Sequence, residues 1–284
     1  MLDKYQYIDT HAHLNLSAFA KDREAVIDEC AKREVAVINV GTKAKTSQLA
    51  VELATAHPHL YAIVGLHPIQ TISARHDEKE LGPEAKPFTS LGEEFDPAVY
   101  RPLAENKKVV GIGECGFDYY HAPSTETYDI QAAAFIAQIE LANELNLPLM
   151  IHTRNGADST VGSPNAYDDV YRLLKQYAKV PGNIHFYSGT LEQAKKFFDL
   201  GFTISFTGVI TFTDDYSEIV KQSPLELIHA ETDCPFVSPK PHRGKRCEPW
   251  MVSQVAKQIA TIKGQDETTV KEQLLKNASQ LYQL

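Results

Sequence analysis

Short apolar runs alternate with longer stretches in which apolar residues recur at helical spacing. The apolar runs lie at 5–10, 35–40, 60–66, 109–114, 147–152, 183–187, 202–206 and 227–232. Helical spacing covers 21–33, 46–57, 96–106, 126–145, 166–177, 191–200, 215–221, 248–263 and 266–281. Strands that are apolar throughout and alternate with amphipathic helices are typical of a parallel sheet covered by helices on its faces.

Eight such strand–helix units within 284 residues predict a closed (β/α)8 TIM barrel that forms a single α/β domain over residues 1–284. A doubly wound open sheet is the alternative fold. It is disfavoured because no GxGxxG motif follows the first apolar run. Two irregular stretches, 69–95 and 155–165, are predicted to be long loops.

Composition narrows the class of protein. The chain carries 28 Lys+Arg against 37 Asp+Glu, a net charge of −9, which argues against a protein that coats nucleic acid with its whole surface. No apolar run approaches the roughly 18 residues of a membrane span, and the N-terminus lacks an apolar signal segment. The four cysteines are widely spaced, without a CxxC pair. We therefore expect a reduced, cytoplasmic protein with no membrane partner and no obligate protein partner.

The polar residues that interrupt this pattern fall at the carboxyl ends of the predicted strands. In a strand, residues two apart share a face, so His11 and His13 point the same way. In a barrel the carboxyl ends of all strands surround one mouth, where the active sites of such barrels lie. Six candidate metal ligands gather there: His11, His13, Glu114, His152, His185 and Asp233.

Six ligands exceed the three or four that one zinc ion needs. The set predicts two adjacent divalent ions with a bridging carboxylate; imidazole and carboxylate ligands suit Mn or Zn, and a hydrated version suits Mg. Such a pair of ions activates a bridging water and polarises a phosphoryl or carbonyl oxygen. Glu114 and Asp233 are therefore candidate catalytic residues as well as ligands.

Two further residues, His67 and Glu231, have candidate roles near this mouth, and two cysteines do not. His67 also ends a strand but has no second ligand candidate nearby in the sequence, so we expect an acid, base or substrate contact rather than a ligand. Glu231 shares a face with Asp233 and is a candidate for orienting a ligand histidine from behind. Cys115, like Cys234, follows a ligand candidate directly and is expected to turn away into the core.

Basic and aromatic residues follow the same strand ends. A basic cluster after the last strand contains Lys240, His242, Arg243, Lys245 and Arg246. This is the barrel position that commonly binds phosphate, so Arg243 and Lys245 are candidate substrate contacts, with Arg154 beside His152 as a third. The tract 117–120 after Glu114 is aromatic, and Tyr119 within it is a candidate for stacking on a base.

With these residues in place, the chain resembles the TatD family of metal-dependent deoxyribonucleases, within the amidohydrolase-like barrels. The matching tracts are DTHAHL (9–14), GLHP (65–68), GIGECGFDYY (111–120), IHTR (151–154), ETDCP (231–235) and PHRGKRCEP (241–249). The resemblance implies a two-metal 3′-to-5′ exonuclease that acts on DNA strand ends, with RNA as an alternative. It also implies that Glu114 bridges a site of His11, His13 and Asp233 and a site of His152 and His185, with His67 and Arg243 near the substrate phosphate.

The chain departs from the family pattern at Phe186, where a cysteine is usual, and at Phe117, where leucine is common. Two other functions stay open at this stage. One is a binuclear hydrolase of another ester or amide, such as an aminoacyl-tRNA deacylase. The other is a non-catalytic nucleic-acid-binding module, which the complete ligand set disfavours.

Overall fold

The computed structural model describes residues 2–73, 75–76, 88–121, 123–156 and 165–284. Eight strands form one parallel sheet in the order β1-β2-β3-β6-β7-β8-β9-β10. Their bounds are β1 Tyr7–Ala12, β2 Val35–Val40, β3 Leu60–Val64, β6 Val109–Asp118, β7 Leu149–Arg154, β8 Gly182–Ile184, β9 Phe202–Phe206 and β10 Ile228–Ala230. The strands follow chain order around the ring, which is the topology of a (β/α)8 barrel.

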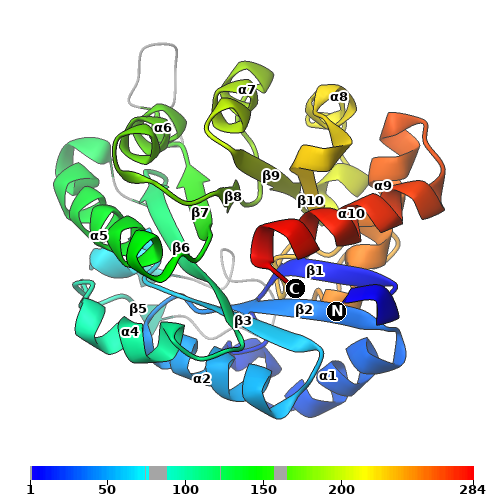
Figure 1. Cartoon of the computed structure of the whole chain (residues 1–284), viewed down its shortest axis with the longest axis horizontal. Coiled ribbons are helices and arrows are strands. Elements are labelled where there is room, and N and C mark those ends of the chain that lie inside the picture. The colour runs from blue at the N-terminus through cyan, green and yellow to red at the C-terminus, as the bar shows by residue number, and fades with distance from the viewer. Residues whose placement is uncertain (1, 74, 77–87, 122, 157–164) are drawn as a thin grey trace.

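Helices surround the sheet on its outer side (Figure 1). They are α1 Arg23–Lys32, α2 Ala44–Ala56, α4 Pro97–Ala104, α5 Ser124–Leu145, α6 Ala166–Tyr177, α7 Leu191–Asp199, α8 Ser217–Gln222, α9 Val252–Lys263 and α10 Glu267–Tyr282. Side-chain caps start several of them: Asn165 accepts from the Tyr167 amide at α6, and Thr190 with Gln193 forms a capping box at α7. Among the described residues, none of the helices has the length and apolar character needed to cross a membrane.

The ring closes between its first and last strands at the carboxyl end. Ala12 and Cys234 form an isolated parallel bridge. The His13 amide donates to the Cys234 carbonyl at 2.9 Å, and the Asp233 amide donates to the His11 carbonyl at 2.9 Å. This closure confirms the barrel and rules out the open sheet, and it places Asp233 directly beside His11 of β1 and His13, which follows β1.

The strands are buried on both faces, since one face packs on the helices and the other fills the barrel. Every residue of β2 and of β6 is buried. In the middle of β6 the pairing with β7 shifts register between Ile112 and Cys115. Gly113 lies within this irregularity and Gly116 just after it, at φ 146° and 140°, and a Cβ at Gly116 would lie 2.1 Å from the His152 carbonyl oxygen. Only glycine permits such a close approach, and Glu114 is fixed between the two.

The predicted elements agree with the structure within a few residues at each end. The first predicted loop, 69–95, contains a short 3-10 helix, Pro68–Thr71, and a two-residue antiparallel pair of β4 Arg75–His76 with β5 Phe88–Thr89. Residues 74 and 77–87 of this stretch and residues 157–164 of the second predicted loop lie outside the described residues.

Candidate metal centre

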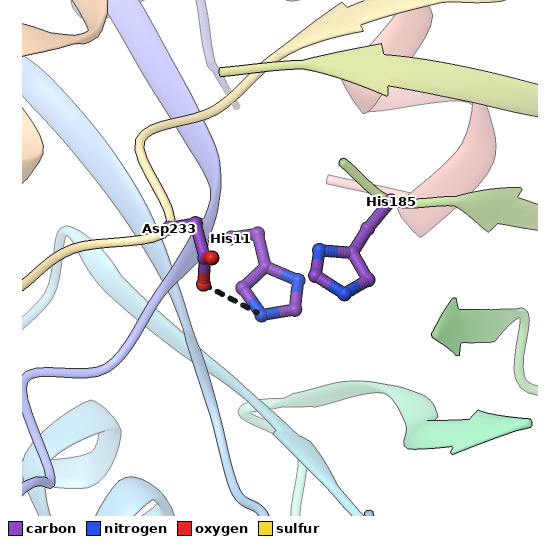
Figure 2. A group of neighbouring side chains, drawn as sticks. All are labelled: His11, His185 and Asp233. Carbon is purple, nitrogen blue, oxygen red and sulfur yellow. Dashed lines mark ion pairs between the residues drawn. The ribbon is translucent and has the colours of Figure 1, made fainter. Parts of the chain in front are cut away.

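The six ligand candidates meet at the carboxyl mouth of the barrel, although they come from five strands. His11 lies in β1, Glu114 in β6 and His152 in β7, while His185 follows β8 by one residue. Figure 2 shows Asp233 directed at His11, with the ring of His185 on the other side of it. The rings of His11 and His185 stack with centroids 4.0 Å apart. The topology thus brings together all six residues that the sequence analysis selected.

One half of the cluster is built from His11, His13 and Asp233. The two Nε2 atoms of His11 and His13 face each other at 3.1 Å. The Asp233 Oδ1 atom lies 3.2 Å from Nε2 of His13 and 3.8 Å from Nε2 of His11. The carboxylate of Glu114 completes this half, with its Oε2 atom 3.4 Å from Nε2 of His11.

The other half is built around the second oxygen of Glu114. Its Oε1 atom lies 2.7 Å from Nε2 of His185, 2.9 Å from Nδ1 of His152 and 3.2 Å from Nε2 of His67. One carboxylate therefore contacts both halves, one oxygen to each. This is the arrangement that a carboxylate bridging two cations needs.

Acceptor atoms lie behind three of the rings. Nδ1 of His13 lies 2.9 Å from the Val40 carbonyl and Nε2 of His152 lies 3.0 Å from Oδ2 of Asp118, while Nδ1 of His185 lies 3.5 Å from Oε1 of Glu231 without a hydrogen bond. Burial lowers the pKa of these three rings, but the carboxylates around them raise it above its usual value. A cation bound among these groups would replace the protons on the inner nitrogens, and the acceptors behind the rings suit protons on the outer ones.

In His67 the nitrogen on the far side from Glu114 accepts a hydrogen bond instead of donating one. The Ile69 amide donates to its Nδ1 atom at 3.1 Å, so the neutral ring carries its proton on Nε2 and presents an N–H to Glu114. Burial, followed by the charge of His152, lowers the pKa of His67 to about 4, which keeps the ring neutral. Although no second ligand candidate is near His67 in the sequence, the fold places it within the cluster, beside Glu114 and His152. Its polarity nevertheless sets it apart from the ligand candidates.

Burial and the neighbouring charges set the ionisation of the cluster. Burial alone raises the pKa of the Glu114 carboxyl, but its histidine neighbours, His185 first and then His67 and His11, hold that pKa well below its usual range. Burial, together with the charge of His185, lowers the pKa of His11 to about 3. An ionised carboxylate beside a neutral imidazole is the state that binds metal ions.

Asp118 is a functional candidate that the sequence analysis missed. Its Oδ2 atom holds His152, and its Oδ1 atom accepts from the amides of Tyr120 at 2.9 Å and His121 at 3.3 Å. Asp118 lies within the aromatic tract 117–120, in which only Tyr119 was predicted to have a role. A carboxylate four residues after Glu114 reaches a neighbouring strand only because β6 continues to Asp118.

Glu231 occupies the corresponding place behind His185. It is fully buried and also accepts from the Phe186 amide and from the Ser205 hydroxyl, each at 2.6 Å. Asn183 donates in turn to Ser205 at 2.7 Å. The Phe186 amide and the Ser205 hydroxyl thus fix the Glu231 carboxylate, whose Oε1 atom lies 3.5 Å from Nδ1 of His185.

The expectation for Tyr119 is wrong. Its side chain is 4% exposed, packs against Phe117 and donates to Asp169 at 2.7 Å. A ring buried in this way cannot stack on a base. The next residue, Tyr120, is 49% exposed, and the guanidinium of Arg154 lies over its ring, 3.8 Å from the centroid.

The basic cluster after β10 divides into two kinds of residue. Arg243 and Lys245 are exposed, and the guanidinium of Arg243 lies over Phe212 at 3.9 Å while donating to the Ser238 carbonyl. Arg246 instead binds Asp22 through two nitrogens, at 2.9 and 2.7 Å, and also Glu248. Its charge is neutralised within the fold, so only part of the cluster faces solvent as free positive charge.

The cysteines lie outside the cluster. Cys115 and Cys234 are fully buried, and burial raises the pKa of both thiols. Sγ of Cys115 lies 3.6 Å from the Met150 carbonyl, within the core. A protonated thiol in this setting packs as a small apolar group and does not bind metal.

The fold and the site together define a (β/α)8 barrel with a histidine–carboxylate cluster at its carboxyl mouth. Residues 8–283 match the family model described as TatD related DNase. The chain belongs to this family and is therefore a hydrolase.

Similar proteins cover nearly the whole chain. An uncharacterized metal-dependent hydrolase, YabD, from Bacillus subtilis is 34% identical over 97% of this chain and 98% of its own length. A protein named 3′-5′ ssDNA/RNA exonuclease TatD from Pantoea ananatis is 30% identical over 97% of this chain and 99% of its own. The crystal structure of the TatD homolog YJJV from Escherichia coli covers both chains fully with 24% identity and a TM-score of 0.79, which supports the same fold.

Proposed function

We propose that this protein is a two-metal exonuclease that removes nucleotides from the 3′ end of single-stranded DNA. The observation that carries the proposal is the carboxylate of Glu114, which contacts His11 with one oxygen and His152 and His185 with the other. One carboxylate shared by two sets of inward-facing nitrogens supports a pair of divalent ions rather than one.

The ligand sets follow from the contacts. His11, His13 and Asp233 would hold one ion, and His152 with His185 the other, with Glu114 shared between them. The candidate ions are Mg, Mn or Zn. When bound, such ions supply an activated water and stabilise the charge that develops on a phosphoryl oxygen.

The remaining cluster residues supply what the ions do not. His67 presents an N–H to the same point as the ligands, so it can donate a hydrogen bond to a phosphoryl oxygen that gains charge. Asp118 accepts a hydrogen bond from Nε2 of His152, which would leave Nδ1 of that ring to an ion, and Glu231 places a carboxylate 3.5 Å behind His185. Asp233 lies at φ 54°, a strained backbone conformation of the kind that clusters at functional sites.

A nucleic-acid strand fits the rim around this cluster. Arg154, Arg243 and Lys245 are exposed around the mouth, and two of them are held in place over aromatic rings. Guanidinium groups fixed in this way suit phosphate oxygens. Because the whole chain carries a net charge of −9, a contact confined to the mouth suits a strand end better than a long duplex.

The experiment is nucleotide release from single-stranded DNA labelled separately at its 3′ and 5′ ends, with Mg²⁺ or Mn²⁺ added to chelator-treated protein. We expect metal-dependent release from the 3′ end, and loss of release for Glu114→Gln. Cyclic amides and aminoacyl-tRNA esters are assayed in parallel. Turnover of these compounds without turnover of DNA would contradict the nuclease and support the other hydrolase.

A further inference from the structure

Tyr120 exposes an aromatic ring at the rim of the mouth. Among the described residues the large hydrophobic side chains that are exposed are Leu91, Val99, Tyr120 and Ile130, and Tyr120 is the aromatic one. Its neighbours in the tract, Phe117 and Tyr119, are buried. The tract therefore offers one aromatic surface to a partner.

Two connections fix this ring beside the candidate metal centre. The Tyr120 amide donates at 2.9 Å to Asp118, and the other oxygen of Asp118 holds His152 at 3.0 Å. Arg154, which covers the ring, follows His152 by two residues on β7 and pairs in register with Asp118 on β6. Asp118 thus links the backbone of Tyr120 to the ligand candidate His152.

Arg154 leaves part of the ring available. Its guanidinium carbon lies 3.8 Å from the ring centroid, which is contact on one face, and the edge of the ring meets His121 with centroids 5.3 Å apart. Exposure of 49% leaves the rest of the Tyr120 side chain in solvent. Within the described part of the chain Arg154 makes no ion pair, so its N–H groups are available to a phosphate oxygen.

We propose that Tyr120 and Arg154 form a subsite for the terminal nucleobase of a single strand. The base stacks on the Tyr120 ring while Arg154 contacts the adjacent phosphate. Stacking accepts any base, and a base can reach the ring only when it is unpaired. The subsite deepens the proposed exonuclease function and rests on it: it selects frayed or single-stranded ends over blunt duplex ends, with little dependence on sequence.

The experiment measures binding and stacking separately from cleavage. The probe is a short single-stranded oligodeoxynucleotide with 2-aminopurine at its 3′ end and phosphorothioate linkages that slow hydrolysis. Stacking of the terminal base on an aromatic ring quenches 2-aminopurine fluorescence. A second probe carries 2-aminopurine at the 5′ end. We expect quenching by the wild-type protein with the 3′ probe and little with the 5′ probe.

Variants test the ring itself. Tyr120→Ala should weaken binding of the 3′ probe by about 5- to 100-fold, the effect of losing one base–aromatic stack, and should abolish the quenching. Tyr120→Phe retains the ring and should stay within about twofold of the wild type. Ile130→Ala, which removes a comparably exposed apolar side chain from α5, is the matched control. Unchanged affinity and quenching in Tyr120→Ala would overturn the subsite.

The outcomes separate the subsite from the proposed function. If the wild-type protein cleaves single strands and Tyr120→Ala does so with the same preference over blunt duplex, the nuclease stands and the subsite falls. If the wild-type protein neither binds nor cleaves any strand, both fall. Loss of the single-strand preference in Tyr120→Ala, with cleavage of blunt duplex retained, supports both.

Discussion

Asp118 accepts a hydrogen bond from Nε2 of His152 at 3.0 Å, while Nδ1 on the other side of the same ring lies 2.9 Å from Glu114. In the neutral ring that would bind an ion, Asp118 thus keeps the proton on Nε2 and leaves the lone pair of Nδ1 to the cluster. Because the amides of Tyr120 and His121 already donate to its Oδ1 atom, an asparagine at 118 would keep its oxygen there and present its NH₂ to His152.

Asp118→Asn should therefore reverse the tautomer of His152 and weaken metal binding at the second ligand set. We expect about a 10- to 100-fold loss of affinity for one of two ions, measured by calorimetric titration with Mn²⁺. Asp169→Asn is the control, since Asp169 accepts from Tyr119 and Arg172 and not from the cluster. Two ions bound by Asp118→Asn at wild-type affinity would contradict this role.

His67 and the ligand candidates should respond differently to substitution. Because His67 presents an N–H rather than a lone pair, His67→Ala should bind the same number of ions as the wild type. Its kcat should fall about 10²- to 10³-fold, as for other hydrogen-bond donors to a developing oxyanion. Metal content by mass spectrometry and kcat on a single-stranded substrate test both points. An ion lost together with His67 would make it a ligand.

Arg243 and Arg246 lie three residues apart but should affect different properties. Arg243→Ala should weaken binding of single-stranded DNA and reduce the slope of log Kd against log salt by about 0.7, the effect of one phosphate contact, with little change in Tm. Arg246→Ala breaks the contacts to Asp22 and Glu248, so Tm should fall by about 2 °C while the salt slope stays the same. The opposite pattern would place the phosphate contact at Arg246.

His229 makes stability depend on pH through burial. It lies inside the barrel, where its Nε2 atom is 3.0 Å from the hydroxyl of Thr203, and burial lowers its pKa to about 3. The unfolded chain takes up the proton near pH 6.5 and the folded chain does not, so stability falls as pH drops from about 6.5 towards 3. At pH 5 the loss from this residue is about 2 kcal/mol.

His229→Gln should remove this component because glutamine does not titrate. Urea unfolding of chelated wild-type and variant proteins at pH 7 and pH 5 gives the comparison. We expect the stability difference between the two pH values to be smaller in His229→Gln by about 2 kcal/mol. Equal differences in both proteins would contradict a neutral, buried His229.

The six ligand candidates were predictable because each lies at the carboxyl end of an apolar strand, and a parallel barrel brings those ends together. The partners behind the rings were not. Val40, Asp118 and Glu231 are set by register between strands, which a single chain does not display. The protonated nitrogen of His67 depends on the amide of Ile69 and could not be predicted from the sequence either.

The errors have similar physical causes. Alternation counted from Glu114 places Asp118 and Tyr120 on its side and Tyr119 on the other, so the candidate chosen at Tyr119 lies on the buried side. In the sequence, Arg246 belongs to a run of basic residues. In the structure it pairs with Asp22, which lies more than 200 positions away in the chain. Such long-range pairing follows from the fold and not from local composition.

The proposed function requires that two ions held by this cluster drive hydrolysis at a 3′ strand end. One measurement tests it directly: the number of metal ions per chain and the rate of nucleotide release from a 3′-labelled single strand, determined on the same preparations of wild-type protein and His152→Ala. We predict two ions and release for the wild type, and one ion with release lost for His152→Ala. Release that survives thorough chelation, or full-rate release by His152→Ala, would contradict the account.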